Sequence, residues 1–432
     1  MLTRRAFAGA AAASAAGALA RPSLAANPDV IIIGAGMAGI AAARAVMEAG
    51  RVPVLIEARG RIGGRTYTES HTFGFPHDHG AAWFEAVERN PLVPLARGLN
   101  FQLAPDPETV SVYIGGRPAD AERYERIYRD AERRIDRAAR NGGDVAVSVA
   151  LQARDSLERL AFAQIGPLDA GVELHQLSAL DYNRQADGGL LLPAAGMGAF
   201  VQSYGASLPV RLGVRAHRVD WSGPGVSVET SAGTLRAPAV IVTVPVGVLA
   251  AGDISFSPPL PADKQDAIAG LPMGSFNRIA LRFERRVIDE KPFTALNALT
   301  RAGDAIYAML RPFQREFAIV CVGGDHGRAL EAKGPQAMID FAIDALVEIY
   351  GGDLRRAVNG THATRWGADV LTRGAYSAAR PGHARKREAL AAPLADRLFF
   401  AGEATDPKWA ARVAGAWTSG QRAARESLAV LR

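Results

Sequence analysis

The hydrophobic pattern near the amino end of the chain describes a strand, a helix and a second strand. Residues 30–33 are four β-branched apolar residues in a row, which is typical of a parallel strand buried on both faces. An alanine-rich helical pattern follows from about Ala38 to Ala49, and Gly50 is well placed to end it. A second apolar run, from Val54 to Glu57, predicts the next strand.

A glycine motif links the first strand to the helix. Gly34 allows the tight turn, Gly36 lets a pyrophosphate approach the backbone, and Gly39 lets the helix pack closely on the strand. The amino end of the helix would direct its N–H groups at the phosphates. Glu57 stands 18 residues after Gly39, close to the ~20 expected for the acid that binds a ribose hydroxyl. The spacing predicts a dinucleotide-binding unit, and the alternative is a glycine-rich turn in an unrelated α/β protein.

The pattern beyond residue 90 predicts further elements of both kinds. Residues 90–190 look mostly helical, and residues 210–249 alternate like a small antiparallel meander that returns to a buried strand. A buried strand at Leu398 to Ala401 and a helix from Gly415 to Val430 close the chain.

The length of the chain, 432 residues, exceeds one ordinary domain. We expect an α/β fold with a discontinuous, Rossmann-like nucleotide-binding domain built from residues 27–89, 195–257 and 381–432. Residues 90–194 and 258–380 would form an α+β substrate-binding domain.

The first 26 residues read as a bacterial twin-arginine export signal. Arg4 and Arg5 precede Phe7 and a weakly hydrophobic alanine and glycine stretch, with cleavage expected near Ala25 or Ala26. We therefore expect an exported or periplasmic protein, and the alternative is a frayed alanine-rich amino end. No run in the sequence approaches the ~20 apolar residues of a membrane span.

Net charge and cysteine content limit which ligands and partners the protein can bind. The formal net charge of +6 includes three arginines of the signal, which leaves too little for a nucleic-acid surface. The most charged stretch, Asp120 to Arg140, pairs Glu122 with Arg126 and Glu125 with Arg129, as a solvated helix does. The single cysteine, Cys321, excludes an internal disulfide and a cysteine metal site, so we expect no metal.

Three further motifs carry a family resemblance. Residues 58–66 read ARGRIGGRT, residues 399–405 read FFAGEAT and residues 415–420 read GAWTSG. A second glycine pair with arginines, directly after Glu57, suits a longer cofactor than a nicotinamide dinucleotide. Together the motifs resemble the flavin-containing amine oxidase family of monoamine, polyamine and L-amino-acid oxidases, over essentially the whole mature chain. The resemblance implies FAD as the cofactor.

The resemblance also assigns residues to the cofactor. Glu57 would bind the adenosine ribose, Ala216 would meet the adenine, and Glu403 would bind the ribityl–phosphate end. Val413 would offer a backbone N–H near the N1/O2 edge of the flavin. The remaining assigned positions are the phosphate-binding Gly34, Gly36 and Gly39, the pyrophosphate-enclosing Arg59, Gly64 and Arg65, the ring-side Gly80, Ala81, Ala82 and Trp83, and Gly402.

The same resemblance implies aromatic residues beside the flavin. Tyr376 would be one wall of an aromatic cage that orients the amine, and Trp366 would lie beside the ring; for each, an ordinary core aromatic is the alternative. Arg412 takes the place of the second cage aromatic, with Trp409 nearby. Glu85 would attract a cationic amine at the tunnel mouth, or is a solvated surface residue.

Two departures from the family pattern bear on the chemistry. Arg278 stands where many members carry a lysine bonded through water to flavin N5, and arginine does not give up its proton. This favours an acceptor other than oxygen, unless Arg278 points to solvent. Ala375 stands where some members carry a cysteine bonded to the flavin, so FAD should be noncovalent.

The expected reaction is FAD-dependent oxidation of a primary or secondary amine, including polyamines, to an imine that hydrolyses to a carbonyl. Electrons would pass to O2 or to another, periplasmic acceptor. The alternatives are a carotenoid desaturase or protoporphyrinogen-oxidase type of flavoenzyme, and a flavin-free carrier with the same fold. The sequence indicates neither the particular amine nor the oligomeric state.

Overall fold

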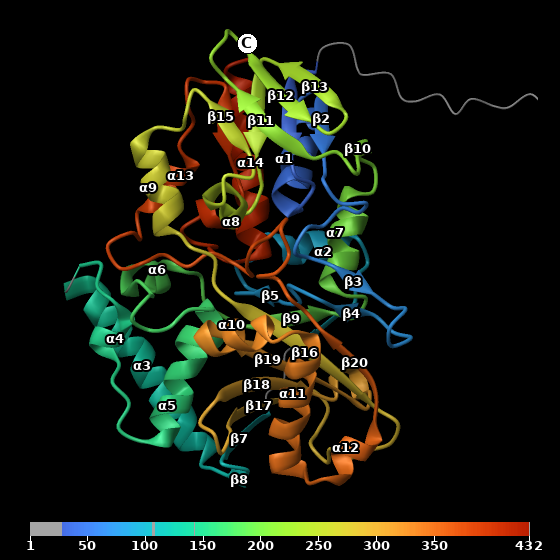
Figure 1. Ribbon diagram of the computed structural model, residues 1–432, viewed down its shortest axis with the longest axis vertical. Coiled ribbons are helices and arrows are strands. Elements are labelled where there is room, and N and C mark those ends of the chain that lie inside the picture. The colour runs from blue at the N-terminus through green and yellow to red at the C-terminus, as the bar shows by residue number, and fades with distance from the viewer. Residues whose placement is uncertain (1–27, 106–108, 142, 432) are drawn as a thin grey trace, which may run out of the picture.

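The structure is a computed structural model that describes residues 28–105, 109–141 and 143–431. The proposed export signal, residues 1–26, lies outside the described residues. Figure 1 shows two parts, one above the other. Within the described residues, no helix is both long enough and apolar enough to cross a membrane.

A five-stranded parallel sheet forms the centre of the upper part (Figure 1). Its strands, in spatial order, are β10 (Val210–Arg211), β2 (Pro53–Ile56), β1 (Val30–Ile33), β14 (Ala239–Val242) and β21 (Leu398–Phe400). These strands come from the three segments assigned above to the nucleotide-binding domain, whose exact boundaries stay a prediction.

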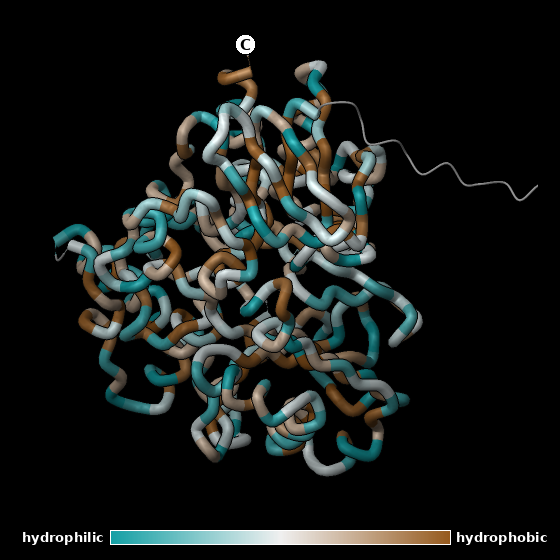
Figure 2. Tube along the Cα trace, turned by 45° about the horizontal axis from the view of Figure 1, so that its top comes forward, coloured by the Kyte–Doolittle hydropathy of each residue, from teal (hydrophilic) through white to brown (hydrophobic). Residues whose placement is uncertain are grey.

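Both faces of this sheet are buried, which explains why its strands are uninterrupted apolar runs. Ile31 and Ile33 of β1 face a core shared with a four-stranded sheet, while Val30 and Ile32 face helices α1 (Met37–Glu48) and α14 (Val413–Ala429). Apolar residues follow these strands in Figure 2. The four-stranded sheet contains β13 (Gly233–Ala237), β12 (Val226–Thr230), β11 (Ala216–Asp220) and β15 (Ser255–Ser257).

A seven-stranded mixed sheet forms the lower part (Figure 1). Its order is β20 (Val358–Ala363), β16 (Phe276–Phe283), β19 (Phe317–Gly323), β18 (Ala305–Leu310), β17 (Thr294–Leu299), β7 (Val110–Ile114) and β8 (Arg117–Pro118). Met338 and Leu346 of helix α11 (Pro335–Tyr350) pack on one face. Arg278 and Asn297, in β16 and β17, belong to the wall of a cavity.

Two small sheets lie between the parts. One joins β3 (Thr68–Glu69) to β4 (His77–Asp78), and the other has the order β5 (Phe84–Glu85), β9 (Leu190–Pro193) and β6 (Leu103–Pro105). The remaining helices are α2 (Leu92–Gly98), α3 (Ala121–Asn141), α4 (Val147–Ala150), α5 (Ser156–Ala163), the π-helix η1 (Gln164–Ala170), α6 (Ala179–Arg184), α7 (Met197–Gly205), α8 (Val246–Ala250), α9 (Ala262–Gly270), α10 (Gly324–Ala332), α12 (Asp353–Ala357) and α13 (Lys386–Ala391), besides two 3₁₀ turns, η2 (Pro312–Gln314) and η3 (Glu403–Thr405).

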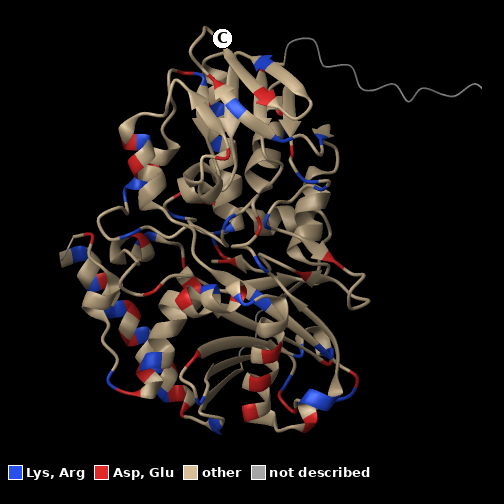
Figure 3. Ribbon diagram, in the orientation of Figure 1, with Lys and Arg blue, Asp and Glu red and all other residues tan. Residues whose placement is uncertain are grey.

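The charged helix predicted near residues 120–140 is α3. Its Glu122–Arg126 and Glu125–Arg129 pairs form at 3.6 and 3.4 Å, and both signs alternate along it in Figure 3. The prediction of a mostly helical segment from residue 90 to 190 is incomplete, because β6, β7 and β8 precede α3.

Candidate active site

One cavity of about 1000 Å³ contains nearly all the predicted site residues in its wall. This volume is at the upper end of the ~300–1,000 Å³ range of ligand pockets, enough for a large cofactor and a small substrate. Of the residues assigned above to cofactor, catalysis or substrate, Gly39 alone is not part of the wall. The tertiary structure therefore brings together positions from residue 34 to residue 413.

The glycine turn after β1 has the shape that a phosphate group needs. Gly34 has φ +102°, a conformation that side chains rarely adopt. A Cβ at Gly39 would lie 1.9 Å from the carbonyl oxygen of Gly34, so Gly39 serves close packing of α1 on the turn. A Cβ at Gly36 would have no atom within 4 Å, and no side chain caps α1 there. The first N–H groups of α1 are therefore available to an anion.

Glu57 fixes the next loop at the end of β2. Its Oε2 accepts a hydrogen bond from Ala35 N at 2.8 Å, and its Oε1 accepts one from Arg59 N at 2.8 Å. The carboxylate thus ties the glycine turn to the second loop and keeps acceptor capacity for a ribose hydroxyl. Ala216, at the start of β11, is also part of the cavity wall.

Glu403 holds three chain segments together beside the cavity. Its carboxylate accepts hydrogen bonds from Arg65 Nη1 at 3.0 Å, from Ser377 N and Oγ at 3.1 and 2.6 Å, and from Ala411 N at 3.1 Å. Burial alone would raise its pKa, but Arg65, Arg387 and these bonds outweigh burial and lower the pKa. Four protein donors fill the usual capacity of a carboxylate, so contact of Glu403 with the ribityl–phosphate end stays a prediction.

Two arginines of the second loop are also paired within the protein. Arg65 Nη1 additionally donates to the carbonyl oxygen of Ala375 at 2.7 Å. Arg59 pairs with Asp369 at 2.6 Å. Gly63 forms an isolated bridge with Gly36, which sets the two glycine loops side by side.

These features fit FAD. The amino ends of α1 and α14 both border the cavity, and neither has a side-chain cap. Val413 begins α14, so its N–H belongs to an uncapped helix end that suits a developing negative charge. Ala375 is part of the same wall and offers no thiol for a covalent bond.

Arg278 is buried beside the predicted ring-side segment 80–83. It is 2% exposed, its Nη1 donates to the carbonyl oxygen of Gly80 at 2.9 Å, and its guanidinium lies 5.1 Å from the ring centre of Trp83. The alternative that Arg278 points to solvent is therefore wrong. Trp366 donates from Nε1 to the carbonyl oxygen of His79 at 3.3 Å and is also part of the cavity wall.

Tyr376 connects the cavity wall to the π-helix η1. Its hydroxyl donates to the carbonyl oxygen of Leu168 at 3.3 Å, and its ring centre lies 5.9 Å from that of Phe276. Burial raises the pKa of Tyr376 well above its ordinary value, so the phenol stays protonated. The residue can act as a wall and a hydrogen-bonding group, and not as a base.

Glu85 and Arg412 form an ion pair at the cavity wall. The Glu85 side chain keeps 33% of its surface exposed and is part of the cavity wall, so attraction of a cationic amine by Glu85 stays a prediction. Arg412 also donates to the carbonyl oxygen of Ala186. Trp409 packs in a hydrophobic cluster at 4% exposure and is absent from the cavity wall.

Asp169 is the residue that sequence analysis missed. It lies in η1, where its carboxylate accepts hydrogen bonds from Gln164 Nε2 at 2.6 Å and Tyr128 Oη at 3.2 Å. Enclosure by the walls raises the pKa of Asp169 to about 7. Among the residues that the structure describes, none forms an ion pair with it. The available signal was Pro167, because a proline inside a helix disrupts the regular hydrogen-bond pattern. Irregular turns such as π-helical turns occur often at functional sites.

Comparison with known proteins agrees with this site. A family model described as flavin containing amine oxidoreductase matches residues 121–428, and one described as an NAD(P)-binding Rossmann-like domain matches residues 32–96. Polyamine oxidase 2 of Arabidopsis thaliana is 30% identical over 93% of this chain and 88% of its own length. Polyamine oxidase 3 of Oryza sativa subsp. japonica is 31% identical, over 93% and 89%.

A solved structure gives the same result for the fold. Wild-type putrescine oxidase bound to putrescine matches with a TM-score of 0.79 at 19% identity, over 94% of this chain and 99% of that chain. The α/β architecture with a Rossmann-like domain is thereby confirmed. With these matches, the chain belongs to the family of flavin containing amine oxidoreductases, and its reaction is the FAD-dependent oxidation of an amine.

Proposed function

We propose that the amine is a diamine or polyamine, and that Asp169 holds a second ammonium group away from the reacting carbon. The carrying observation is the Asp169 carboxylate at the cavity wall, which has hydrogen-bond donors but no ion-pair partner among the described residues. A cation in a cavity of low dielectric gains much from such a partner.

The neighbourhood of Asp169 supports this role. Tyr376 donates to Leu168, the residue immediately before Asp169, so the cage residue and the acid share one turn of η1. Glu85 contributes negative charge as well, although Arg412 offsets it. The two curated relatives described above are both named polyamine oxidases.

FAD, when bound in the cavity, would supply the acceptor of hydride equivalents from the α-carbon of the amine. Within this chain, Tyr376 and Trp366 would orient that carbon as walls. Arg278 places a fixed positive charge beside segment 80–83, where it stabilises negative charge. Glu403 and Arg65, which are hydrogen-bonded to each other, hold the chain on both sides of Tyr376 in place. The imine product then hydrolyses to a carbonyl compound and a smaller amine.

The test is Asp169→Asn, measured with a diamine and with a monoamine of matched length. Loss of a charge-assisted hydrogen bond, about 1.5–3 kcal/mol, should raise KM for the diamine about 10- to 100-fold and leave the monoamine nearly unchanged. Asp340→Asn, on the exposed side of α11, is the control for removal of one negative charge. Equal effects of Asp169→Asn on both amines would contradict the diamine proposal.

We further propose that the protein is exported and that its electron acceptor is a carrier other than O2. Arg4 and Arg5 support export, and Arg278 in place of lysine supports slow reaction with O2. Replacement of Arg4 and Arg5 by lysine should retain the protein inside the cell, as fractionation would detect. Normal export of that variant would remove the basis for a twin-arginine signal.

A further inference from the structure

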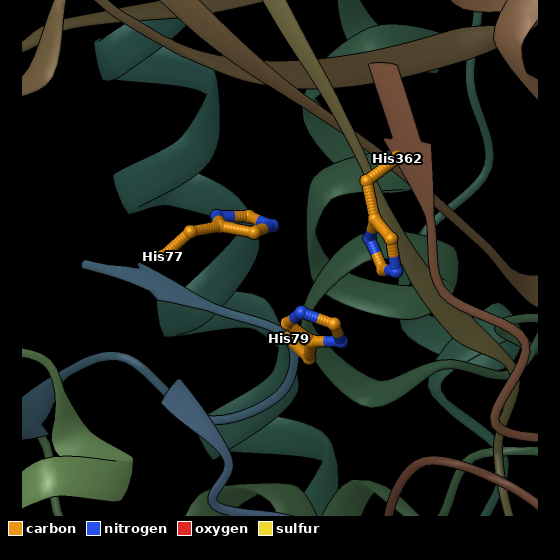
Figure 4. Close-up of side chains that lie close together, drawn as sticks. All are labelled: His77, His79 and His362. Carbon is orange, nitrogen blue, oxygen red and sulfur yellow. The ribbon is translucent and has the colours of Figure 1, made fainter. Parts of the chain in front are cut away.

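Three histidines converge outside the cavity described above. His77 lies in β4, His79 follows that strand, and His362 lies in β20 of the seven-stranded sheet. Figure 4 shows the three rings turned toward a common space. One ligand atom from each histidine lies within 4.8 Å of the corresponding atoms of the other two. Residues far apart in sequence are thus gathered by the tertiary fold.

Three ring nitrogens of this histidine cluster are buried without a hydrogen-bond partner among the described residues. His77 is 3% exposed, and neither of its ring nitrogens has a partner among the described residues. Nδ1 of His362 is likewise buried without a partner. Phe73 and Phe317 pack edge-on against His77 at ring-centre distances of 5.3 and 5.6 Å. Because a buried polar group without a partner is costly, the arrangement points to a missing ligand.

The surroundings of two of the imidazoles disfavour their charged form. Burial, with help from Arg278, lowers the pKa of His77 to about 2. Burial and His362 lower the pKa of His79 to about 4, although Glu69 opposes them.

Glu69 stands behind the histidine cluster as an orienting carboxylate. It is paired with His77 across the β3–β4 ladder, and its Oε1 lies 3.4 Å from Nε2 of His79. Thr72 N also donates to Glu69 at 3.0 Å. A carboxylate that holds one nitrogen of an imidazole leaves the other nitrogen for a metal and fixes the ring, as in many metal sites. Its negative charge also offsets the nearby positive charge of Arg278.

We propose that His77, His79 and His362 bind one divalent first-row transition-metal ion, with zinc as the reference ion. Imidazole nitrogens suit zinc, copper and nickel, and three histidines with an open fourth position form a recurring zinc site. Two nitrogens of a tetrahedral zinc site stand about 3.4 Å apart, so ligand atoms that lie within 4.8 Å of one another would draw in by at most about 1.4 Å on binding. The sequence-based expectation of no metal considered cysteine ligands only, and it gave the spacing of His77 and His79 no weight.

The metal would hold one wall of the active-site cavity in place. The carbonyl oxygen of His79 accepts from Trp366 Nε1, and that of the next residue, Gly80, accepts from Arg278. A metal ion bound by both His79 and His362 would therefore hold the ring-side segment, residues 80–83, next to β20. The proposed role is positional, and the histidines would not touch the amine.

The experiment is metal titration of the flavin-loaded protein after dialysis against a chelator. We expect one Zn²⁺ per chain by elemental analysis after removal of free metal, a rise in Tm on addition of Zn²⁺, and no effect of Mg²⁺, which prefers oxygen ligands. His362→Gln and His79→Gln should lower Zn²⁺ affinity at least about 100-fold, and Glu69→Gln about 10- to 100-fold. Exposed His217, on β11, gives the matched control His217→Ala, which should bind zinc like the wild type.

The flavin spectrum and the Tm without metal report folding of each variant. His362 is only partly buried, so His362→Gln keeps the test informative where replacement of the buried His77 prevents folding. A folded wild type that retains no zinc would overturn the proposal, leaving a packed cluster of neutral histidines. Equal zinc affinity of folded His362→Gln and wild type would overturn it as well.

Discussion

The two ends of the active-site cavity are built in different ways. At the cofactor end, acceptors and charges are already engaged: Glu57 binds two backbone N–H groups, and Glu403 takes four protein donors. At the substrate end, the Asp169 carboxylate has two neutral donors and no ion pair among the described residues. The cofactor end is organised before its ligand arrives, whereas the substrate end keeps a charge for its ligand.

This difference follows from the charge and flexibility of the two ligands, the dinucleotide and the amine. A dinucleotide is bound by uncapped helix ends and close backbone approach, which need rigid loops and glycine. The carboxylates at that end therefore serve to hold loops. A flexible cationic amine is bound through charge and walls, so an acid without a cationic partner is the useful feature.

The largest effect is expected from Gly39→Ala at the cofactor end. The new Cβ would lie 1.9 Å from the Gly34 carbonyl oxygen and 3.2 Å from the Thr243 hydroxyl, and the clash with backbone forces α1 and the turn apart. FAD affinity should fall about 100-fold or more, at least about 2.7 kcal/mol, as flavin content and titration would measure. Gly98→Ala is the matched control, because a Cβ there meets nothing within 4 Å. Full flavin content in Gly39→Ala would break the distinction between the two ends.

Tyr376→Ala should affect the substrate end alone. Loss of this wall should lower kcat/KM for amines about 10- to 100-fold, equivalent to about 1.4–3 kcal/mol, because orientation of the reacting carbon is lost. Flavin content should stay near the wild-type value. Loss of FAD instead would mean that Tyr376 supports the cofactor end through the segment that Glu403 holds.

The pH dependence of substrate preference should report Asp169. Its pKa is raised to about 7, so the carboxylate gains its charge as pH rises through 7 and loses it below. The ratio of kcat/KM for a diamine to that for a monoamine should therefore rise about 5- to 10-fold between pH 6 and pH 8. In Asp169→Asn this ratio should be flat. A flat ratio in the wild type would show that Asp169 does not carry the preference.

Arg278→Lys should give the smallest change, at the boundary of the two ends. A lysine can give up its proton and is less bulky than the guanidinium that now contacts Gly80. We expect the oxygen-dependent half of turnover to speed up several-fold, with little change in the amine-dependent half, as rapid-mixing absorbance would separate. Unchanged rates for both halves, with fast oxygen reaction in the wild type, would favour an ordinary oxidase.

The sequence by itself determined the nucleotide unit and the family. Val30 to Glu57 encode strand, turn, helix and strand through contacts that are close in sequence, so the motif predicts the elements to within a residue or two: β1 and α1 lie at 30–33 and 37–48. The motifs that identified FAD are likewise short and continuous. The roles of their side chains toward the cofactor stay predictions. That these motifs line one cavity could be predicted from the family resemblance.

Only the tertiary structure decided the substrate end and the histidine cluster. Tyr376 donates a hydrogen bond to Leu168, the neighbour of Asp169, from 208 residues away. Arg412 forms an ion pair with Glu85, although the two residues are far apart in the sequence. His362 likewise reaches His79 from a different sheet. Local hydrophobic periodicity carries no information about such pairs, because which side chains meet depends on how the two sheets and η1 pack together. That packing, and not the motif, leaves Asp169 without an ion-pair partner in the part of the chain that the structure describes.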